Sequence, residues 1–209
     1  MKIKLTQTGK RYNREWIFRR FDYTFHSGIS YAITGSNGSG KSTLLQVIAG
    51  ATMASEGKVT YFKDNDKFIE EQYANQEIAI AAPYLELIEE MTATELLRFH
   101  AHFKPLVASY DDILQTVGLS KAANKQIRYF SSGMKQRLKL AQAFFSKVPV
   151  LLLDEPTTNL DLAGIELYHH LIKNHTNNKI VIVCSNDSFE YDFCSEKISV
   201  ELYKSQSLQ

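Results

Sequence analysis

A glycine-rich run is the first stretch of this sequence whose residue types and spacing can do chemistry. Residues 35–43 read GSNGSGKST and fit the pattern G-x-x-x-x-G-K-[ST], with a β-rich run before them and a helical pattern after them. In such a loop, backbone N–H groups point inward around phosphate groups, the start of the helix adds its positive end, and Lys41 neutralises the β- and γ-phosphate oxygens. The Ser42 hydroxyl is the expected Mg²⁺ ligand, and Thr43 supplies the next donor along the turn. We therefore predict a phosphate-binding P-loop made of Gly35, Ser36, Asn37, Gly38, Ser39, Gly40, Lys41, Ser42 and Thr43.

Two adjacent carboxylates follow an apolar run and have the chemistry that a bound triphosphate needs. Residues 148–156 read VPVLLLDEP, so Asp154 emerges where a carboxylate would meet Mg²⁺, and Glu155 stands beside it. A carboxylate next to a metal-bound triphosphate can orient and deprotonate an attacking water. The alternative is that both residues only end a strand before Pro156, which the P-loop in the same chain disfavours. We predict Asp154 as a metal ligand and Glu155 as the general base.

A third polar group ends another apolar run. Residues 179–188 read KIVIVCSNDS, and their β-branched content is typical of a buried parallel strand. Ligands bind just outside the carboxyl ends of such strands in open α/β sheets. We therefore expect Asn186 to lie at the same edge as the P-loop.

The elements that must position these residues alternate along the chain. The runs 78–82, 148–155 and 179–185 are almost continuously apolar, as parallel strands covered on both faces are. Together with the P-loop they predict an α/β fold, with a P-loop NTPase core, a mostly parallel sheet, N-terminal antiparallel strands and an inserted helical subdomain. Further strands are expected at 2–8, 28–35 and 57–62, and helices at 41–49, 92–104 and 133–147, the last capped by Ser131 or Ser132. We predict one domain over residues 1–209, in which 1–83 and 147–209 form the α/β core and 84–146 the helical subdomain.

Composition limits the classes of partner. The chain has 209 residues, of which 44% are hydrophobic, and this is enough for a sizeable core. Its formal charge of +1 gives no electrostatic footprint for nucleic acid, so no nucleic-acid partner is expected. No apolar stretch approaches the roughly 18 to 20 residues that span a bilayer. The two cysteines lack metal-ligand or redox spacing, so we expect reduced thiols and a cytoplasmic location.

The segment 130–137, FSSGMKQR, resembles the signature L-S-G-G-Q-x-Q-R of the ATP-binding cassette (ABC) ATPases. The resemblance covers the chain from about Lys2 to Ser199 and implies ATP and Mg²⁺ as cofactors, with ATP held between two subunits. It assigns a nucleotide-binding role to Ser131, Ser132, Gly133 and Asp161, the last in a D-loop-like stretch at 158–161, and it places Tyr12 where an aromatic ring stacks on adenine. Ser132 replaces the first signature glycine, and Met134 replaces glutamine.

The sequence departs from this family at two catalytic positions. Pro83 stands where the family has the Q-loop glutamine, and proline offers neither a side-chain acceptor nor an N–H. Glu86 and Tyr84 are the nearby polar side chains that offer a substitute. Asn186 stands where the family has the switch histidine, and an amide donates a hydrogen bond but carries no charge. We expect slow but nonzero ATP hydrolysis.

The resemblance implies the ATP-hydrolysing subunit of an ABC transporter. The partners would be a separate transmembrane permease and a second cassette, as a homodimer or heterodimer, at the inner face of the cell membrane. Residues 83–90 offer apolar side chains among three carboxylates, which suits a basic amphipathic helix, although a solvated connection explains them equally well. Two alternatives stay open: a regulatory module that dimerises with ATP and has vestigial hydrolysis, and a soluble non-transport ABC protein. The transported substrate and its direction are not encoded in these residues.

Overall fold

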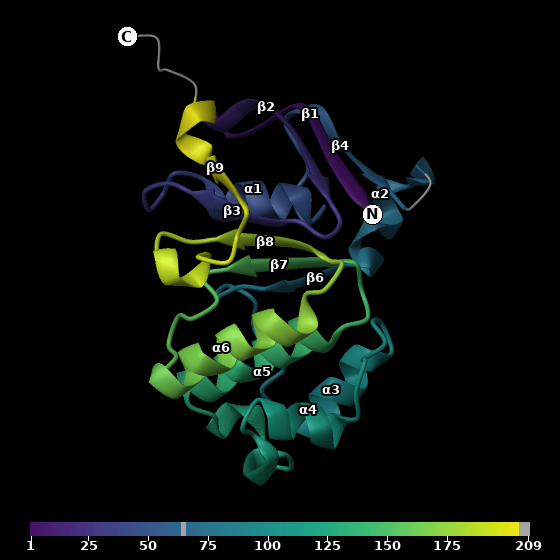
Figure 1. Cartoon of the computed structure of the whole chain (residues 1–209), viewed down its shortest axis with the longest axis vertical. Helices are drawn as coiled ribbons and strands as arrows, with labels where there is room; N and C mark the ends of the chain where they lie inside the picture. Colours follow the sequence, from purple (N-terminus) through teal and green to yellow (C-terminus); the bar gives the residue numbers. More distant parts are fainter. Residues whose placement is uncertain (64–65, 205–209) are drawn as a thin grey trace.

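The computed structural model describes residues 1–63 and 66–204, which form two sheets with helices between and below them (Figure 1). The N-terminal sheet is antiparallel, in the order β2-β1-β4-β5. The second sheet is parallel throughout, in the order β6-β7-β8-β3-β9. The predicted combination of an antiparallel and a parallel sheet is therefore confirmed. The strands are β1 (Lys2–Tyr12), β2 (Glu15–His26), β3 (Ser30–Thr34), β4 (Glu56–Phe62), β5 (Phe68–Ile69), β6 (Ile78–Ala81), β7 (Val150–Asp154), β8 (Ile180–Cys184) and β9 (Glu196–Ser199).

Six α-helices are present in the described part of the chain. Helix α1 lies between the two sheets, whereas α5 and α6 cover the other face of the parallel sheet and α3 and α4 lie beyond them (Figure 1). Local capping fixes several helix starts: Thr92 and Glu95 form a capping box at α3, and Ser131 caps α5 by accepting a hydrogen bond from the Met134 N–H at 3.2 Å. The helices are α1 (Lys41–Ile48), α2 (Glu71–Ala74), α3 (Ala93–Ala101), α4 (Tyr110–Thr116), α5 (Ser132–Phe145) and α6 (Leu162–His175).

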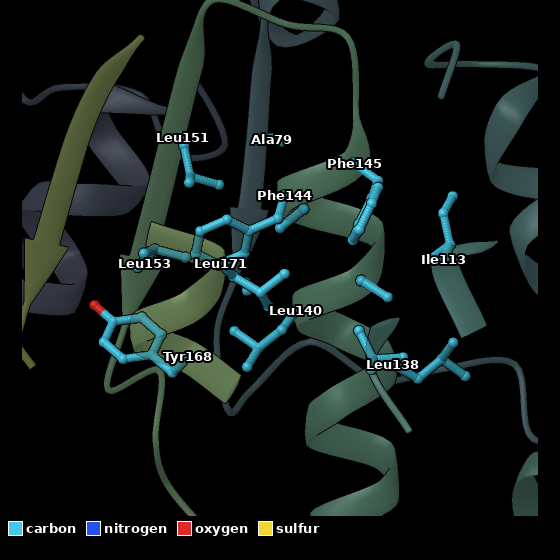
Figure 2. Packing of buried hydrophobic residues seen from close by; sticks show 14 of the residues in the cluster. Ala79, Ile113, Leu138, Leu140, Phe144, Phe145, Leu151, Leu153, Tyr168 and Leu171 are labelled. Atoms are coloured by element: carbon cyan, nitrogen blue, oxygen red, sulfur yellow. The ribbon is translucent and has the colours of Figure 1, made fainter. Parts of the chain in front are cut away.

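The parallel strands separate two cores by the alternation of their side chains. Along β7, Val150 and Leu152 pack toward α1, whereas Leu151 and Leu153 pack toward α5 and α6. Figure 2 shows the second core, where Leu140 and Phe144 of α5 meet strand residues of β6 and β7 and residues of α6. All five residues of β7 and of β8 are buried, because both faces of the sheet are covered. This explains the continuous apolar runs in the sequence.

The sequence patterns missed six strands and α-helices of the described residues: β2, β5, β9, α2, α4 and α6. The register of β2 against β1 is interrupted by three shifts, which break the regular alternation on which strand prediction depends. Strand β9 has four residues and only one buried side chain, Ile198. It forms an edge beyond β3, so the run 179–185 is not the last strand of the sheet. Within the described residues, no helix combines the length and apolar character that crossing a membrane requires.

Candidate active site

The residues predicted to bind and hydrolyse the nucleotide lie at the carboxyl edge of the parallel sheet. The P-loop follows β3, Asp154 ends β7, and Asn186 lies two residues beyond the end of β8. Because β7, β8 and β3 are neighbours and run in parallel, their carboxyl ends share one edge. The structure thus brings three groups to one edge, although the first and the last of them, the P-loop and Asn186, lie more than 140 residues apart in the sequence.

The P-loop turns tightly before α1 begins. Gly40 has φ of 104°, and a Cβ at this position would lie 2.4 Å from Cγ2 of Ile17, so only glycine fits. The Lys41 side chain folds back over the loop, where its Nζ donates hydrogen bonds to the carbonyls of Gly35 at 2.7 Å and Ser36 at 3.2 Å. Lys41 is 5% exposed, and the buried Ser39 hydroxyl has no hydrogen-bond partner within the described residues. The loop therefore holds a buried cation and a free hydroxyl beside the start of a helix, which suits an anionic phosphate.

Asp154 and Ser42 provide two oxygen atoms that are suited to bind a metal ion. Asp154 is 2% exposed, its side chain accepts a hydrogen bond from Ser42, and its Oδ1 has no partner within the described residues. Burial raises the pKa of Asp154 to about 6, the Ser42 hydrogen bond opposes the rise, and the charge of Glu155 adds to it. A buried, unpaired carboxylate oxygen beside a serine hydroxyl is costly without a cation, so this donor set fits Mg²⁺.

Glu155 adopts a backbone conformation that is uncommon for a residue with a side chain. Its φ is 42°, and its N–H donates to the carbonyl of Cys184 on β8 at 2.9 Å. Strain of this kind occurs at functional sites where the surrounding structure enforces it. Glu155 and Asn186 line the same cavity, which has a volume of about 450 Å³, with Asn37 on its P-loop side. A water in this cavity would be within the reach of a general base.

Asn186 contacts the P-loop directly. Its Nδ2 donates a hydrogen bond to Oδ1 of Asn37 at 2.5 Å. The sequence predicted both residues in the site but not their contact, because 149 residues separate them. The amide of Asn186 is therefore held toward the phosphate loop.

The signature segment and Asp161 form a separate group. Ser131, Ser132, Gly133 and Asp161 line a cavity of about 330 Å³ that shares no residue with the cavity beside Glu155. Asp161 caps α6 through the Gly164 N–H at 2.9 Å and accepts a hydrogen bond from Arg137 of α5 at 2.9 Å. The predicted site residues thus lie in two places, one at the P-loop and one at the start of α5.

Tyr12 lies at the end of β1 with 47% of its surface exposed. The Nζ of Lys10 lies 5.0 Å from the centre of its ring. The hairpin that Tyr12 begins continues into β2, whose Ile17 packs against Gly40 of the P-loop. An exposed ring near the loop is consistent with stacking on a base, and this role stays a prediction.

The segment after β6 places Tyr84, rather than Glu86, toward the site. The Tyr84 side chain hydrogen-bonds with Gln46, which lies one helical turn beyond Ser42 on α1. Burial raises the pKa of Tyr84 to about 12, and the charge of Asp154 contributes to the rise. The carbonyl of Pro83 accepts a hydrogen bond from Nζ of Lys139 at 3.0 Å. Tyr84 and Glu86 are the two side chains that could replace the Q-loop glutamine. Tyr84 is close enough to Asp154 for the charge of Asp154 to affect its pKa.

Sequence reasoning missed Glu190. This carboxylate is 2% exposed and accepts hydrogen bonds from the N–H of Thr157, at 2.7 Å, and from its hydroxyl. It fixes the segment that follows Glu155. In the sequence SNDSFEYD it is one acidic residue of a polar turn, so no local signal distinguishes it.

The fold and the P-loop define a P-loop nucleoside triphosphatase, and comparison with known proteins gives its family. The sequence profile of the ABC transporter family matches residues 18–158. The chain is 28% identical over 186 residues to the uncharacterised ABC transporter ATP-binding protein YybJ of Bacillus subtilis, covering 88% of this chain and 84% of that protein. It is 32% identical over 180 residues to the cytochrome c biogenesis ATP-binding export protein CcmA of Mesorhizobium japonicum, covering 84% of this chain and 86% of that protein.

A solved structure has the same fold. The dimeric ATP-binding cassette MJ0796, in a post-hydrolysis state with ADP and Pi, superposes with a TM-score of 0.81 at 24% identity, covering 94% of this chain and 93% of that chain. The chain belongs to the ABC transporter family, as one of its ATP-binding subunits. The cassettes of this family are ATPases.

Proposed function

We propose that this chain binds ATP with Mg²⁺ and hydrolyses it slowly to power a transporter whose pore is a separate permease subunit. The observation that carries the proposal is the convergence of the P-loop, Asp154, Glu155 and Asn186 at one edge of the parallel sheet. In this assignment Lys41 binds the β- and γ-phosphates, and Ser42 and Asp154 hold Mg²⁺. Bound Mg²⁺ would neutralise charge that develops on the phosphates. Glu155 orients the attacking water and accepts its proton.

The two separate groups of site residues support a dimer. A nucleotide at the P-loop of one chain would meet the start of α5 from a second cassette, which offers the Ser131 to Gly133 backbone and the positive end of a helix. Asp161 and its neighbours would line the same interface. The second cassette is another copy of this chain or a related one. We propose that ATP closes this dimer and that hydrolysis reopens it.

Two departures support slow turnover. Asn186 offers an amide donor in place of an imidazole, and Pro83 offers no side-chain acceptor. Removal of one preorganised donor costs about 2.7 to 4 kcal/mol in the transition state, or roughly 10²- to 10³-fold in rate, and replacement by a weaker donor costs less. The contact of Asn186 with Asn37 keeps the donor close to the P-loop, so we expect activity to remain measurable.

The surface beside Tyr84 is the proposed contact with the permease. A cavity of about 430 Å³ lies between the end of α1, strand β6 and Leu85, and Lys104 also lines it. Glu89 forms an ion pair with Lys135, and Glu86 lies near Lys139. Lysines of α5 thus already lie beside two of the three carboxylates of residues 83–90. These two carboxylates are therefore less available to a basic helix of a partner. Apolar contact in the cavity would then contribute more than charge, and docking would hold the chain at the inner face of the membrane.

Steady-state ATP hydrolysis tests the proposal directly. Three proteins are compared: the parent, Glu155→Gln as the blank without the base, and Asn186→His as the probe of the donor. Turnover above the blank, and faster turnover in the histidine variant, would support a hydrolase whose amide is a weak donor. If the parent equals the blank while ATP still drives dimerisation, the proposal of intrinsic hydrolysis is wrong.

That second outcome would favour the alternative, a regulatory dimer with vestigial hydrolysis. The observations that support it are Pro83 and Asn186, whereas Lys41, Asp154 and Glu155 count against it. Addition of candidate permease subunits separates the two functions, because only a transporter subunit should be stimulated by them.

A further inference from the structure

The C-terminal turn reaches the P-loop because of strand register. Strand β9 lies beside β3 (Figure 1) and is parallel to it. Thr34 and Ser199 are the last pair in their register. The P-loop begins directly after Thr34, and a short 3₁₀ helix, Val200–Tyr203, begins directly after Ser199. Continuing the same register by two residues places Ser36 opposite Glu201. The two segments are 165 residues apart in sequence.

The contact at this point consists of two hydrogen bonds to one carboxylate oxygen. Oε1 of Glu201 accepts from the N–H of Ser36 at 2.9 Å and from the Ser36 hydroxyl at 2.6 Å. Both bonds lower the pKa of Glu201, so the group is ionised at neutral pH. Val200 is fully buried, and a Cβ at Gly35 would lie 3.0 Å from its Cγ1. The C-terminal turn therefore packs closely against the first two residues of the P-loop.

The turn that carries Glu201 is anchored on its other side. The ring of Tyr203 packs on Phe21 of β2, with 4.4 Å between ring centres and an angle of 51° between the rings. Phe21 is fully buried in the core between the two sheets. An anchored carboxylate loses less freedom on forming a hydrogen bond than one on a mobile tail does, so it can fix its partner.

Ser36 links Glu201 to Lys41. Its N–H and hydroxyl are held by Glu201, and its carbonyl accepts a hydrogen bond from Nζ of Lys41 at 3.2 Å. We propose that Glu201 is a positioning residue, which sets the backbone at the start of the P-loop so that the loop is preorganised for the phosphates. This inference goes beyond the proposed function and rests only on its nucleotide-binding part.

Three variants test this role. Glu201→Ala removes the acceptor, whereas Glu201→Gln keeps an amide oxygen in the place of Oε1 and removes the charge. Glu196→Ala is the matched control, since Glu196 pairs with Tyr31 at the opposite end of the same strand. The first readout is hydrogen exchange of residues 35–40 without nucleotide, which needs neither ATP binding nor hydrolysis. The second is the Kd of a fluorescent ATP analogue with Mg²⁺, measured in the Glu155→Gln background.

We expect faster exchange at residues 35–40 and a Kd raised about fivefold in Glu201→Ala, with both values within about twofold of the parent in Glu201→Gln and Glu196→Ala. An alanine variant that exchanges and binds as the parent does, or binds more tightly, would overturn the proposal. A glutamine variant as weak as the alanine variant would also overturn it, because charge rather than the acceptor would then matter. If the parent itself fails to bind the analogue, the nucleotide-binding assignment fails, and the exchange measurement still decides whether Glu201 holds the loop.

Discussion

Asp154→Asn should stabilise the metal-free protein although it removes a proposed metal ligand. Asp154 is 2% exposed, and one of its oxygens has no hydrogen-bond partner within the described residues. In the absence of a cation, the ionised carboxylate at neutral pH is therefore poorly compensated. Asparagine has nearly the same shape and no charge, so it relieves this cost.

The size and the sign of this change in stability follow from the pKa of Asp154. Burial raises this pKa from 3.8 to about 6, so the folded state binds the proton more tightly than the unfolded state does. Stability is then lost as the pH rises from about 3.8 to about 6, by about 3 kcal/mol in total. Asparagine accepts a weaker hydrogen bond from Ser42, which costs about 1 kcal/mol. We expect Asp154→Asn to be more stable than the parent by about 2 kcal/mol at pH 7.5 and by less than about 1 kcal/mol at pH 5.

Urea denaturation in EDTA at both pH values measures this difference. Asp187→Asn, an exposed carboxylate near the same edge, is the matched control and should change stability by less than about 0.5 kcal/mol. Addition of Mg²⁺ and ATP should stabilise the parent more than the asparagine variant. An asparagine variant that is no more stable than the parent at pH 7.5, or a difference that does not shrink at pH 5, would refute the reasoning.

Two further predictions concern the helices that support the site. Leu140→Ala removes a fully buried side chain from the core in Figure 2 and should lower the free energy of unfolding by about 3 kcal/mol, whereas Leu202→Ala, at an 82% exposed position, should change it by less than about 0.5 kcal/mol. Equal effects of the two changes in urea denaturation would contradict the assigned packing. Thr92→Ala removes the N-cap of α3 and should cost about 1 kcal/mol, with Thr92→Ser restoring most of it. A serine variant as unstable as the alanine variant would show that the cap is not the cause.

The sequence alone predicted those parts of the proposed site whose chemistry is local. The P-loop residues 35–43 are contiguous, and their glycines, lysine and hydroxyls have no simpler use in that order. The apolar runs before Asp154 and Asn186 indicated buried parallel strands, because strands covered on both faces have no polar side to alternate with. A cap at Ser131 or Ser132 was recognisable for a similar reason, since capping depends on the residues that follow, and the structure shows that Ser131 is the cap.

Only the tertiary structure decided which distant groups meet. The contact of Asn186 with Asn37 and that of Glu201 with Ser36 depend on the order and register of β8, β3 and β9. Strand β9 is too short and too exposed to be predicted from the sequence. Asp154 is buried at the end of β7, and the oxygen that has no partner within the described residues is a consequence of that burial. Local patterns record what a residue does to its near neighbours along the chain. They do not record which strand edge packs beside which loop, and that arrangement placed Glu201 against the P-loop.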